Sequence, residues 1–530
     1  MEQFSMPFWI SSDGEHCVMF IMENPYRTQL SFFAKPALGF SVSHEYPEIG
    51  GGRTNRFRIY LTEKDPVSCA KIYRDFMIES GRFVTLDGKA EQNPDIEKLY
   101  GAPFIYLWGD FILSEEDINW EAFCRFPGHA LAVSLPEVFC DADRWADSFT
   151  SDLICDMKES GIDHTWIGLN SWEQAYRKPE LVRQAADAGY LIASYGSYHS
   201  IHEPGKEKWT TARFDDLNLY EDATVVNKDG KRESGFQNVG RKLNPALSMP
   251  AVKARMEKIM ANGLPFNSWF IDCDATGEIY DDYAPGHRLT MEQDAAARLE
   301  RMAYIRDQYQ MVIGSEGGND FAASTIAFAH GIELKTFSWV DEDMKSNRDS
   351  EYYIGVYYNP AGGVAEHFAR RIPVKDEYFK VFVDPRYDIP LFKLVYNDSV
   401  ITAAHWDWST FKIKGATQDR MIREVLYNVP PLYHLDREEW EEYRQDIVSH
   451  HIAWSAFGKK AIREEMTDFV YLKEDGTVQK TVYGDRLAAV GNFGDAPYMY
   501  GNTEILPHSV LIEDEGGRMI YAPSPEEGNR

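Results

Sequence analysis

The sequence of 530 residues is longer than one compact core, which stops growing at roughly 250–300 residues, so two or three domains are expected. Hydrophobic residues make up 44% and aromatic residues 14% of the chain, which excludes a largely disordered protein. The 55 Lys and Arg against 84 Asp and Glu give a net charge of −29, which repels phosphate backbones and anionic lipid headgroups. We therefore expect no nucleic-acid partner and no membrane partner.

The N-terminal sequence MEQFSMPFWISSDGEHC lacks the basic and apolar regions of a signal peptide. No later run approaches the ~18 apolar residues that span a bilayer. We therefore expect a cytoplasmic protein.

The first hundred residues predict an antiparallel β-domain over residues 1–100. Aromatic and β-branched runs such as CVMFIM, QLSFFA and RFRIYLT alternate with the turn sequences NPY, GGG and TEKDP. A linker helix is expected over residues 66–81, where apolar residues recur three and four apart and a glycine ends the pattern. We interpret this part as a β-sandwich domain.

Residues 101–454 alternate short apolar runs with amphipathic segments, the pattern of a parallel sheet with helical crossovers. Eight such runs predict a (β/α)₈ barrel of the TIM type. The expected strands are 103–108, 164–169, 190–195, 268–272, 311–316, 332–337, 399–404 and 428–434. The clearest expected helices are 145–160, 178–189, 249–263 and 290–309. An open doubly wound sheet would need a Gly-rich turn after its first strand, and LWGDFILSEED has none.

Strand-like sequence returns over residues 455–530. The segments MTDFVYLKEDGTVQKTVYGDRLAAVGNFG and SVLIEDEGGRMIYAP place the turn sequences EDG, YGD and EGG between β-rich runs. We expect a C-terminal β-sandwich domain.

Two acids follow the fourth and fifth expected barrel strands. Asp272 ends SWFID, and Glu316 ends MVIGSE ahead of two glycines that let the backbone turn away. Catalytic groups of such barrels lie at the carboxyl ends of the strands. Two carboxylates there meet the requirement of glycoside hydrolysis, one to attack the sugar or activate water and one to protonate the leaving oxygen. We predict Asp272 and Glu316 as the catalytic pair.

The seventh expected strand leads into His405, Trp406 and Asp407 of the motif HWDW. Tryptophan faces suit the C–H side of a sugar ring, while imidazole and carboxylate groups suit its hydroxyls. Further strand ends contribute polar and aromatic groups that we expect to line the same pocket. They are Trp108, Asp110, Asn170, Trp172, Tyr195, Tyr198, His199 and Asp274.

This mixture of groups favours a neutral, hydroxyl-rich ligand over a phosphate, which would call for clustered Arg and Lys. The histidines show no HExxH pattern, and His199 with His202 in HSIH is a weak metal signal. We predict a carbohydrate substrate, no cofactor and no metal.

With its Asp after strand four and Glu after strand five, the sequence resembles glycoside hydrolase families 101 and 129, the α-N-acetylgalactosaminidases. The segments WFIDCDA and MVIGSEGG carry the resemblance. It implies an N-terminal β-supersandwich, a barrel and a C-terminal β-domain. It also implies retention of an α-linkage, with Asp272 as the nucleophile and Glu316 as the acid and base.

The sequence departs from that pattern in the insert GEIYDDYAPGHRLT between the two acids. We expect its residues Glu278, Asp281, Asp282 and His287 to form a long loop over the pocket. Such a loop would narrow the pocket to a terminal sugar, as in an exo-acting enzyme on small oligosaccharides or glycoconjugates. The resemblance implies an α-linked N-acetylgalactosamine or galactose as that sugar.

Two alternatives stay open. One is an inverting, α-galactosidase-like or α-glucosidase-like hydrolase whose acid is Asp341 in TFSWVDED, and the other is a carbohydrate-binding protein without catalysis. Assembly into a homo-oligomer is also possible on this sequence.

Overall fold

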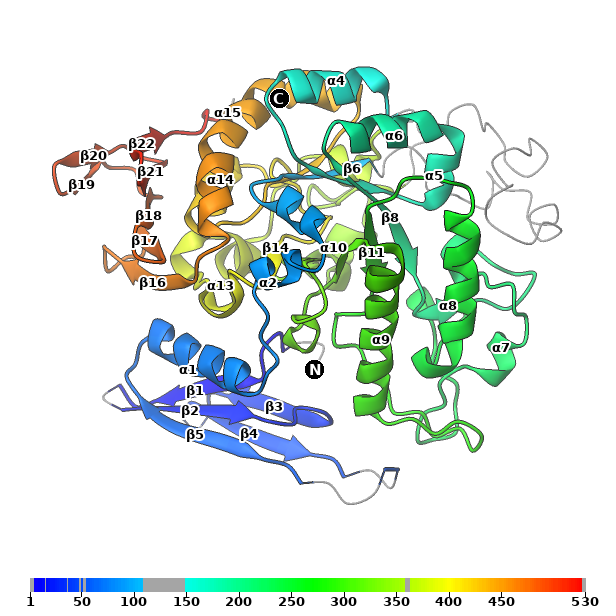
Figure 1. The fold of residues 1–530 in the computed structure, drawn as a ribbon. Coiled ribbons are helices and arrows are strands. Elements are labelled where there is room, and N and C mark those ends of the chain that lie inside the picture. The colour runs from blue at the N-terminus through cyan, green and yellow to red at the C-terminus, as the bar shows by residue number, and fades with distance from the viewer. Residues whose placement is uncertain are drawn as a thin grey trace.

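The computed structural model describes residues 4–14, 16–35, 37–46, 49–50, 54–107, 148–357 and 363–526. Two small antiparallel sheets form its N-terminal part (Figure 1). Trp9 stacks on Phe20 of the first sheet, and Phe40 of the second sheet meets both rings, so aromatic contacts join the sheets. The strands are β1 (Phe8–Ser12), β2 (Cys17–Met22) and β5 (Phe57–Thr62) in the first sheet, and β3 (Thr28–Phe33) and β4 (Gly39–His44) in the second.

Helix α1 (Pro66–Glu79) connects these sheets to the rest of the chain. The Asp65 carboxylate accepts hydrogen bonds from the first-turn N–H groups, and Pro66 lacks an N–H that would need a partner. The buried Arg74 of α1 forms a bidentate ion pair with Asp398, which follows helix α13 (Leu391–Tyr396). The expected linker helix therefore anchors the N-terminal sheets.

Eight parallel strands form the central barrel, confirming the predicted fold class. They follow one another in the order β14-β13-β12-β11-β8-β7-β6-β15. Their bounds are β6 (Phe104–Leu107), β7 (Trp166–Leu169), β8 (Leu191–Ser197), β11 (Ser268–Asp272), β12 (Val312–Glu316), β13 (Phe328–His330), β14 (Ile401–Ala403) and β15 (Leu432–His434). Among the described strands no ladder joins β14 to β15, but Thr410 exchanges two hydrogen bonds with Leu432 at this seam.

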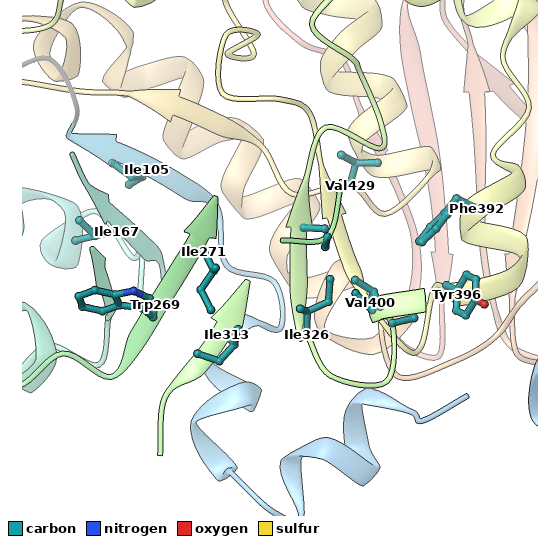
Figure 2. Close-up of a cluster of buried hydrophobic side chains, with 14 of the residues drawn as sticks. Ile105, Ile167, Trp269, Ile271, Ile313, Ile326, Phe392, Tyr396, Val400 and Val429 are labelled. Carbon is teal, nitrogen blue, oxygen red and sulfur yellow. The ribbon is translucent and has the colours of Figure 1, made fainter. Parts of the chain in front are cut away.

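Alternation along each strand separates two apolar layers. The outer layer packs beneath the helices, and Figure 2 shows four of its members, Ile105, Ile167, Ile271 and Ile313, one from each of four strands. The inner layer fills the barrel with large aromatic rings, namely Phe104, Tyr106, Trp166, Phe270 and Phe328. Gly314 leaves the space for one of them, since a Cβ there would lie 2.1 Å from the Phe328 ring. At the carboxyl ends of β11 and β12, the inner face ends in Asp272 and Glu316.

The sixth strand lies earlier than predicted. It is β13 at Phe328–His330, whereas residues 332–337 form a loop that leads into the 3₁₀ turn η7 (Phe337–Val340). Gly331 follows β13 with φ of +115°, a conformation that ends the strand. The apolar alternation of IELKTF arises because Leu334 and Phe337 pack in a separate cluster outside the barrel.

The four clearest predicted helices are all present. They are α4 (Ser151–Glu159), α6 (Pro179–Asp187), α8 (Pro245–Met260) and α9 (Met291–Tyr309). Further helices around the barrel are α5 (Trp172–Arg177), α14 (Thr417–Leu426) and α15 (Arg437–Ala461). Thr290 and Gln293 form a capping box at the start of α9, which fixes the end of the loop after β11.

The C-terminal part is antiparallel, as expected. Its five-stranded sheet has the order β16-β17-β18-β21-β22, with bounds β16 (Met466–Tyr471), β17 (Val478–Tyr483), β18 (Leu487–Asn492), β21 (Ser509–Asp514) and β22 (Gly517–Tyr521). A hairpin of β19 (Tyr498–Tyr500) and β20 (Thr503–Ile505) adds a second layer. Helix α15 continues through residue 455, so it joins this part to the barrel as one unbroken element (Figure 1).

Candidate active site

Asp272 and Glu316 end the neighbouring strands β11 and β12. The pairing of Ile271 with Ser315 places the next residue of each strand side by side, on the face that points into the barrel. A carboxylate oxygen of Asp272 lies within 4.8 Å of one of Glu316. The structure therefore brings the two predicted acids together at the mouth of the barrel.

Two hydrogen-bond donors contact this pair. The Tyr195 hydroxyl on β8 donates to Asp272 Oδ2 at 2.6 Å, and the Cys273 thiol lies 3.3 Å from the same oxygen and 3.6 Å from Glu316 Oε2. Cys273 has φ of +62°, in the left-handed region that side chains other than glycine rarely adopt. This strained residue turns the chain sharply after β11 and places its thiol between the two carboxylates.

The two carboxyl groups also influence each other's protonation. Burial and the negative charge of Glu316 raise the pKa of Asp272 to about 8, and burial also raises the pKa of Glu316. No Lys or Arg of the described chain forms an ion pair with either acid. The pair therefore holds one proton near neutral pH, leaving one carboxylate and one carboxylic acid.

His405 follows strand β14 and faces Glu316, with its Nε2 atom 3.5 Å from Oε1. Its Nδ1 atom accepts a hydrogen bond from the Asp407 backbone N–H at 3.2 Å. Burial lowers the pKa of His405 to about 4, so the imidazole is neutral near pH 7. Nε2 then carries the hydrogen, and it lies near Glu316 Oε1 without a hydrogen-bond partner in the described chain.

The Asp407 carboxylate is fully buried and held by three side chains. It accepts hydrogen bonds from Trp339 Nε1 at 2.7 Å, Tyr357 at 3.1 Å and His367 Nε2 at 2.8 Å. Burial raises its pKa, but the nearby imidazoles of His367 and His405 outweigh burial and hold the pKa well below its usual range. Asp407 is therefore a charged anchor for the side chains beside Glu316.

On the other side of Cys273, His199 and Glu278 form a second polar cluster. Arg298 donates to His199 Nδ1 at 2.9 Å, so His199 Nε2 bears the hydrogen that Glu278 accepts at 3.1 Å. Lys242 Nζ lies 2.8 Å from the other Glu278 oxygen. Burial opposes the charged form, but His199 and Lys242 hold the pKa of Glu278 well below its usual range.

Cys273 belongs to both groups of potential metal ligands found in the described residues, one with His199 and Glu278 and the other with Asp272 and Glu316. The first group offers no free nitrogen, because His199 Nε2 donates to Glu278 and Nδ1 accepts from Arg298. We therefore assign no metal-dependent step to the group of His199, Cys273 and Glu278.

Asp341, the alternative acid, lies on the rim. Its carboxylate caps the short helix α10 (Glu342–Lys345) and forms an ion pair with Lys375 at 2.7 Å. Although burial opposes it, hydrogen bonds from Lys375 and Met344 N–H lower the pKa of Asp341. An ionised group with these partners has no proton to give to a leaving group.

The sequence that carries this site matches the model of a known family. The model of the glycosyl hydrolases related to the GH101 family, GH129, matches residues 156–482, which include both strand-end acids. The chain belongs to family GH129. It is therefore a glycosidase with a carbohydrate substrate. No curated protein sequence matches it significantly.

Solved structures agree on the fold of this GH129 protein. The ligand-free α-N-acetylgalactosaminidase NagBb from Bifidobacterium bifidum is similar with a TM-score of 0.66 and 18% identity, covering 92% of this chain and 74% of NagBb. The complex of NagBb with GalNAc is similar with a TM-score of 0.65 and 19% identity, covering 92% of this chain and 72% of NagBb. A cycloalternan-degrading enzyme from Trueperella pyogenes gives 0.51 and 9% identity, covering 98% of this chain and 72% of that enzyme.

Several residues predicted to line the pocket of this GH129 protein have other surroundings. Trp172 is fully buried against Trp269, and the buried Tyr198 hydroxyl contacts Met256 Sδ. Asp274 is fully buried, with both oxygens on the Arg301 guanidinium. These contacts stabilise the packing of α8 and α9 behind the site.

Two further predicted pocket residues have contacts in the structure, and two lie outside the described residues. The backbone N–H of Asn170 donates to Gln174 at the start of α5, and Trp406 packs edge-on against Phe270 inside the barrel. Trp108 and Asp110 lie outside the described residues.

In the insert after β11, Asp281 bonds Arg27 of the N-terminal part, and Asp282 bonds His287 and Asn244. Of the four insert residues singled out, only Glu278 contacts the His199 cluster directly. The other three fix the loop itself.

Sequence reasoning missed Cys273, Trp339, Tyr357 and His367. Cys273 sits inside the quoted motif WFIDCDA, but only its backbone angle distinguishes it from an ordinary buried thiol. Trp339 precedes Asp341 by two positions. The motif TFSWVDED was considered for Asp341, whereas its Trp339 is the residue that contacts Asp407. Tyr357 and His367 reach Asp407 from 50 and 40 residues upstream, and no local pattern marks them.

Proposed function

We propose that this protein is a retaining α-glycosidase in which Asp272 is the nucleophile and Glu316 is the acid and base. The observation that carries the proposal is the close approach of two buried carboxyl groups at adjacent strand ends, without a neutralising cation in the described chain. One oxygen of each acid lies within 4.8 Å of the other, and this close approach supports the retaining arrangement, whose carboxyl groups are about 5–5.5 Å apart, over the inverting one at about 6.5–9.5 Å.

In the first step an Asp272 oxygen forms an ester bond to the anomeric carbon. The bond from that carbon to the leaving oxygen breaks, and this oxygen takes the proton of Glu316. In the second step water gives a proton to Glu316 and its hydroxyl to the anomeric carbon, and the ester bond to Asp272 breaks. The first step needs one proton on the pair, and the second needs Glu316 as a carboxylate. Burial and the charge of Glu316 keep one proton on the free pair near neutral pH by raising the pKa of Asp272, and the mechanism requires that proton on Glu316 when Asp272 attacks.

The surroundings of the pair fit these roles. Tyr195 and Cys273 donate toward Asp272 and stabilise its carboxylate before attack. The unpartnered Nε2 of His405 lies 3.5 Å from Glu316 Oε1, close enough to turn its N–H toward that carboxylate after proton donation. Tyr195, His199 and His405 are the predicted pocket residues whose contacts best support a role beside the sugar.

We further propose a terminal α-galactose or α-N-acetylgalactosamine as the sugar that is released. The resemblance to family 129 supports this choice, and NagBb bears the name of an α-N-acetylgalactosaminidase. In the second polar cluster, Lys242 and Glu278 of the inserted loop offer a donor and an acceptor for sugar hydroxyls. The released unit is then a single sugar of a small oligosaccharide or glycoconjugate.

A panel of nitrophenyl α- and β-glycosides tests this proposal, followed by NMR of the anomer that is released first. We expect turnover of an α-galactoside or α-N-acetylgalactosaminide with initial release of the α-anomer. Release of the β-anomer from such a substrate would contradict the retaining mechanism.

Three further expectations remain predictions. The division at residues 100 and 454, the cytoplasmic location and homo-oligomer formation are testable by limited proteolysis, cell fractionation and light scattering. In the described residues, no helix combines the length and apolar character needed to cross a membrane.

A further inference from the structure

Three aromatic side chains extend outward from the His405 side of the candidate site. We call Trp339, Phe236 and Trp209 the aromatic row. Between ring centroids, Trp339 lies 5.7 Å from His405. Phe236 lies 5.6 Å from Trp339, and Trp209 lies 6.3 Å from Phe236. The row connects loops that follow two different barrel strands, β8 and β13.

The inner end of the row is fixed beside the proposed acid. Trp339 Nε1 donates to the buried Asp407 carboxylate at 2.7 Å, and His405 lies between Trp339 and Glu316. In the proposed mechanism Glu316 protonates the oxygen of the leaving group. The leaving group therefore departs on the side where the row begins.

The middle of the row is an apolar ring held toward solvent by a constrained loop. Phe236 is 46% exposed, and the two residues after it, Gln237 and Asn238, both have positive φ values of 53° and 61°. Gly235 is required there, since a Cβ would lie 2.2 Å from the Val239 carbonyl oxygen. Backbone strain that keeps a large apolar side chain exposed points to a binding function.

The loop is also anchored on both sides. The Gly235 N–H donates to the Gly240 carbonyl at 3.1 Å, and the bridge of Ser234 to Arg241 leads into the pairing of β10 (Arg241–Lys242) with β9 (Ser200–Ile201). Phe236 thus projects from a braced hairpin that is paired with β9, the short strand after β8.

We propose that the aromatic row binds a second sugar ring on the leaving-group side, so that the enzyme selects a disaccharide or longer saccharide over a small aglycone. The inference rests on the proposed function and names the leaving-group part of its substrate. Flat aromatic faces suit the C–H face of a pyranose, whose hydroxyls stay in water at the rim.

The test compares two substrates of one sugar, α-galactosyl fluoride and the disaccharide melibiose, or their N-acetylgalactosamine counterparts if the glycoside panel assigns that sugar. For Phe236→Ala we expect the ratio of kcat/KM for the disaccharide to that for the fluoride to fall about tenfold, mainly through KM. Phe236→Tyr keeps a flat ring and should restore the ratio, whereas Phe236→Leu should not. The control Phe32→Ala removes a ring that is 61% exposed on β3 and should leave the ratio unchanged.

The same sugar α-linked to the threonine of a tripeptide distinguishes a peptide leaving group. A loss for the glycopeptide but not for the disaccharide in Phe236→Ala would overturn the inference, as would an unchanged ratio. If the wild type cleaves no substrate, the proposed function fails and the row is tested by binding alone. Melibiose should then quench tryptophan fluorescence of the wild type but not of Phe236→Ala, and equal titrations would refute the row as a saccharide site.

Discussion

Two pairs of buried carboxylates start two residues apart at the end of β11. Asp272 pairs with Glu316 of β12, and Asp274 lies near Asp294 of α9. Asp274 and Asp294 are neutralised by Arg301 and Arg298, which contact them through charged hydrogen bonds. Asp272 and Glu316 have no such cation among the described residues. Burial raises the pKa of both, and the charge of Glu316 raises that of Asp272 further. The difference separates an acid pair that stabilises the fold from one that is free to do chemistry.

The largest expected effect comes from removing the proposed nucleophile. Asp272→Asn should lower kcat/KM by about 10⁴-fold or more, even for an α-glycosyl fluoride, because no ester can form. Steady-state kinetics would measure this loss. The control Asp341→Asn changes an ion-paired acid on the rim and should retain turnover. The reverse ranking of these two variants would refute the choice of acids.

The second acid should show a dependence on the leaving group. Glu316→Gln should reduce hydrolysis of a disaccharide by about 10²–10⁴-fold, because its alkoxide needs a proton. A fluoride leaves without one, so its cleavage should suffer far less. Rates of both substrates with one enzyme preparation measure the contrast. Equal losses on the two substrates would remove Glu316 from the role of acid.

Removing an acid that is paired with arginine should lower the free energy of unfolding. Asp274→Asn leaves the buried Arg301 guanidinium without its partner, at an expected cost of about 3–5 kcal/mol. The midpoint of urea unfolding should therefore fall. Asp272→Asn, which removes one of two repelling acids, should not lower that midpoint. A stable Asp274→Asn variant would break the distinction between the two pairs.

A smaller effect is expected in the pH profile. The pair loses its last proton as the pH rises through the raised pKa of Asp272, about 8, so kcat/KM should decline above this pH. In Glu316→Gln the repelling charge is absent, the pKa of Asp272 falls, and the alkaline decline with the fluoride substrate should disappear. A wild-type profile that stays flat to pH 10 would contradict the shared proton.

Much of this arrangement could be predicted from sequence because strand periodicity determines it. Seven of the eight expected strands overlap the observed ones, and both acids follow apolar runs whose alternation directs them inward. The sixth strand was misplaced because burial of Leu334 and Phe337 outside the barrel imitates strand alternation.

Other features could not be predicted because they depend on distant contacts. Nothing local reveals that Asp274 meets Arg301, or that Trp172 turns into the core while Tyr195 reaches Asp272. The exposed Phe236 equally reads as an ordinary loop residue until its distance to Trp339 is known. Tertiary packing determines which side chains meet across the barrel mouth, and such contacts leave no periodic pattern in the sequence.

The most direct test of the central claim is to trap the glycosyl-enzyme intermediate. The enzyme would be incubated with a 5-fluoro-α-glycosyl fluoride of the sugar it hydrolyses, which keeps the substituent at carbon 2, then digested and analysed by peptide mass spectrometry. We predict a mass increase of one fluorosugar on the peptide that contains Asp272, absent in Asp272→Asn. An enzyme that turns over its substrate with inversion and carries no adduct, or carries it on another acid, would contradict the account.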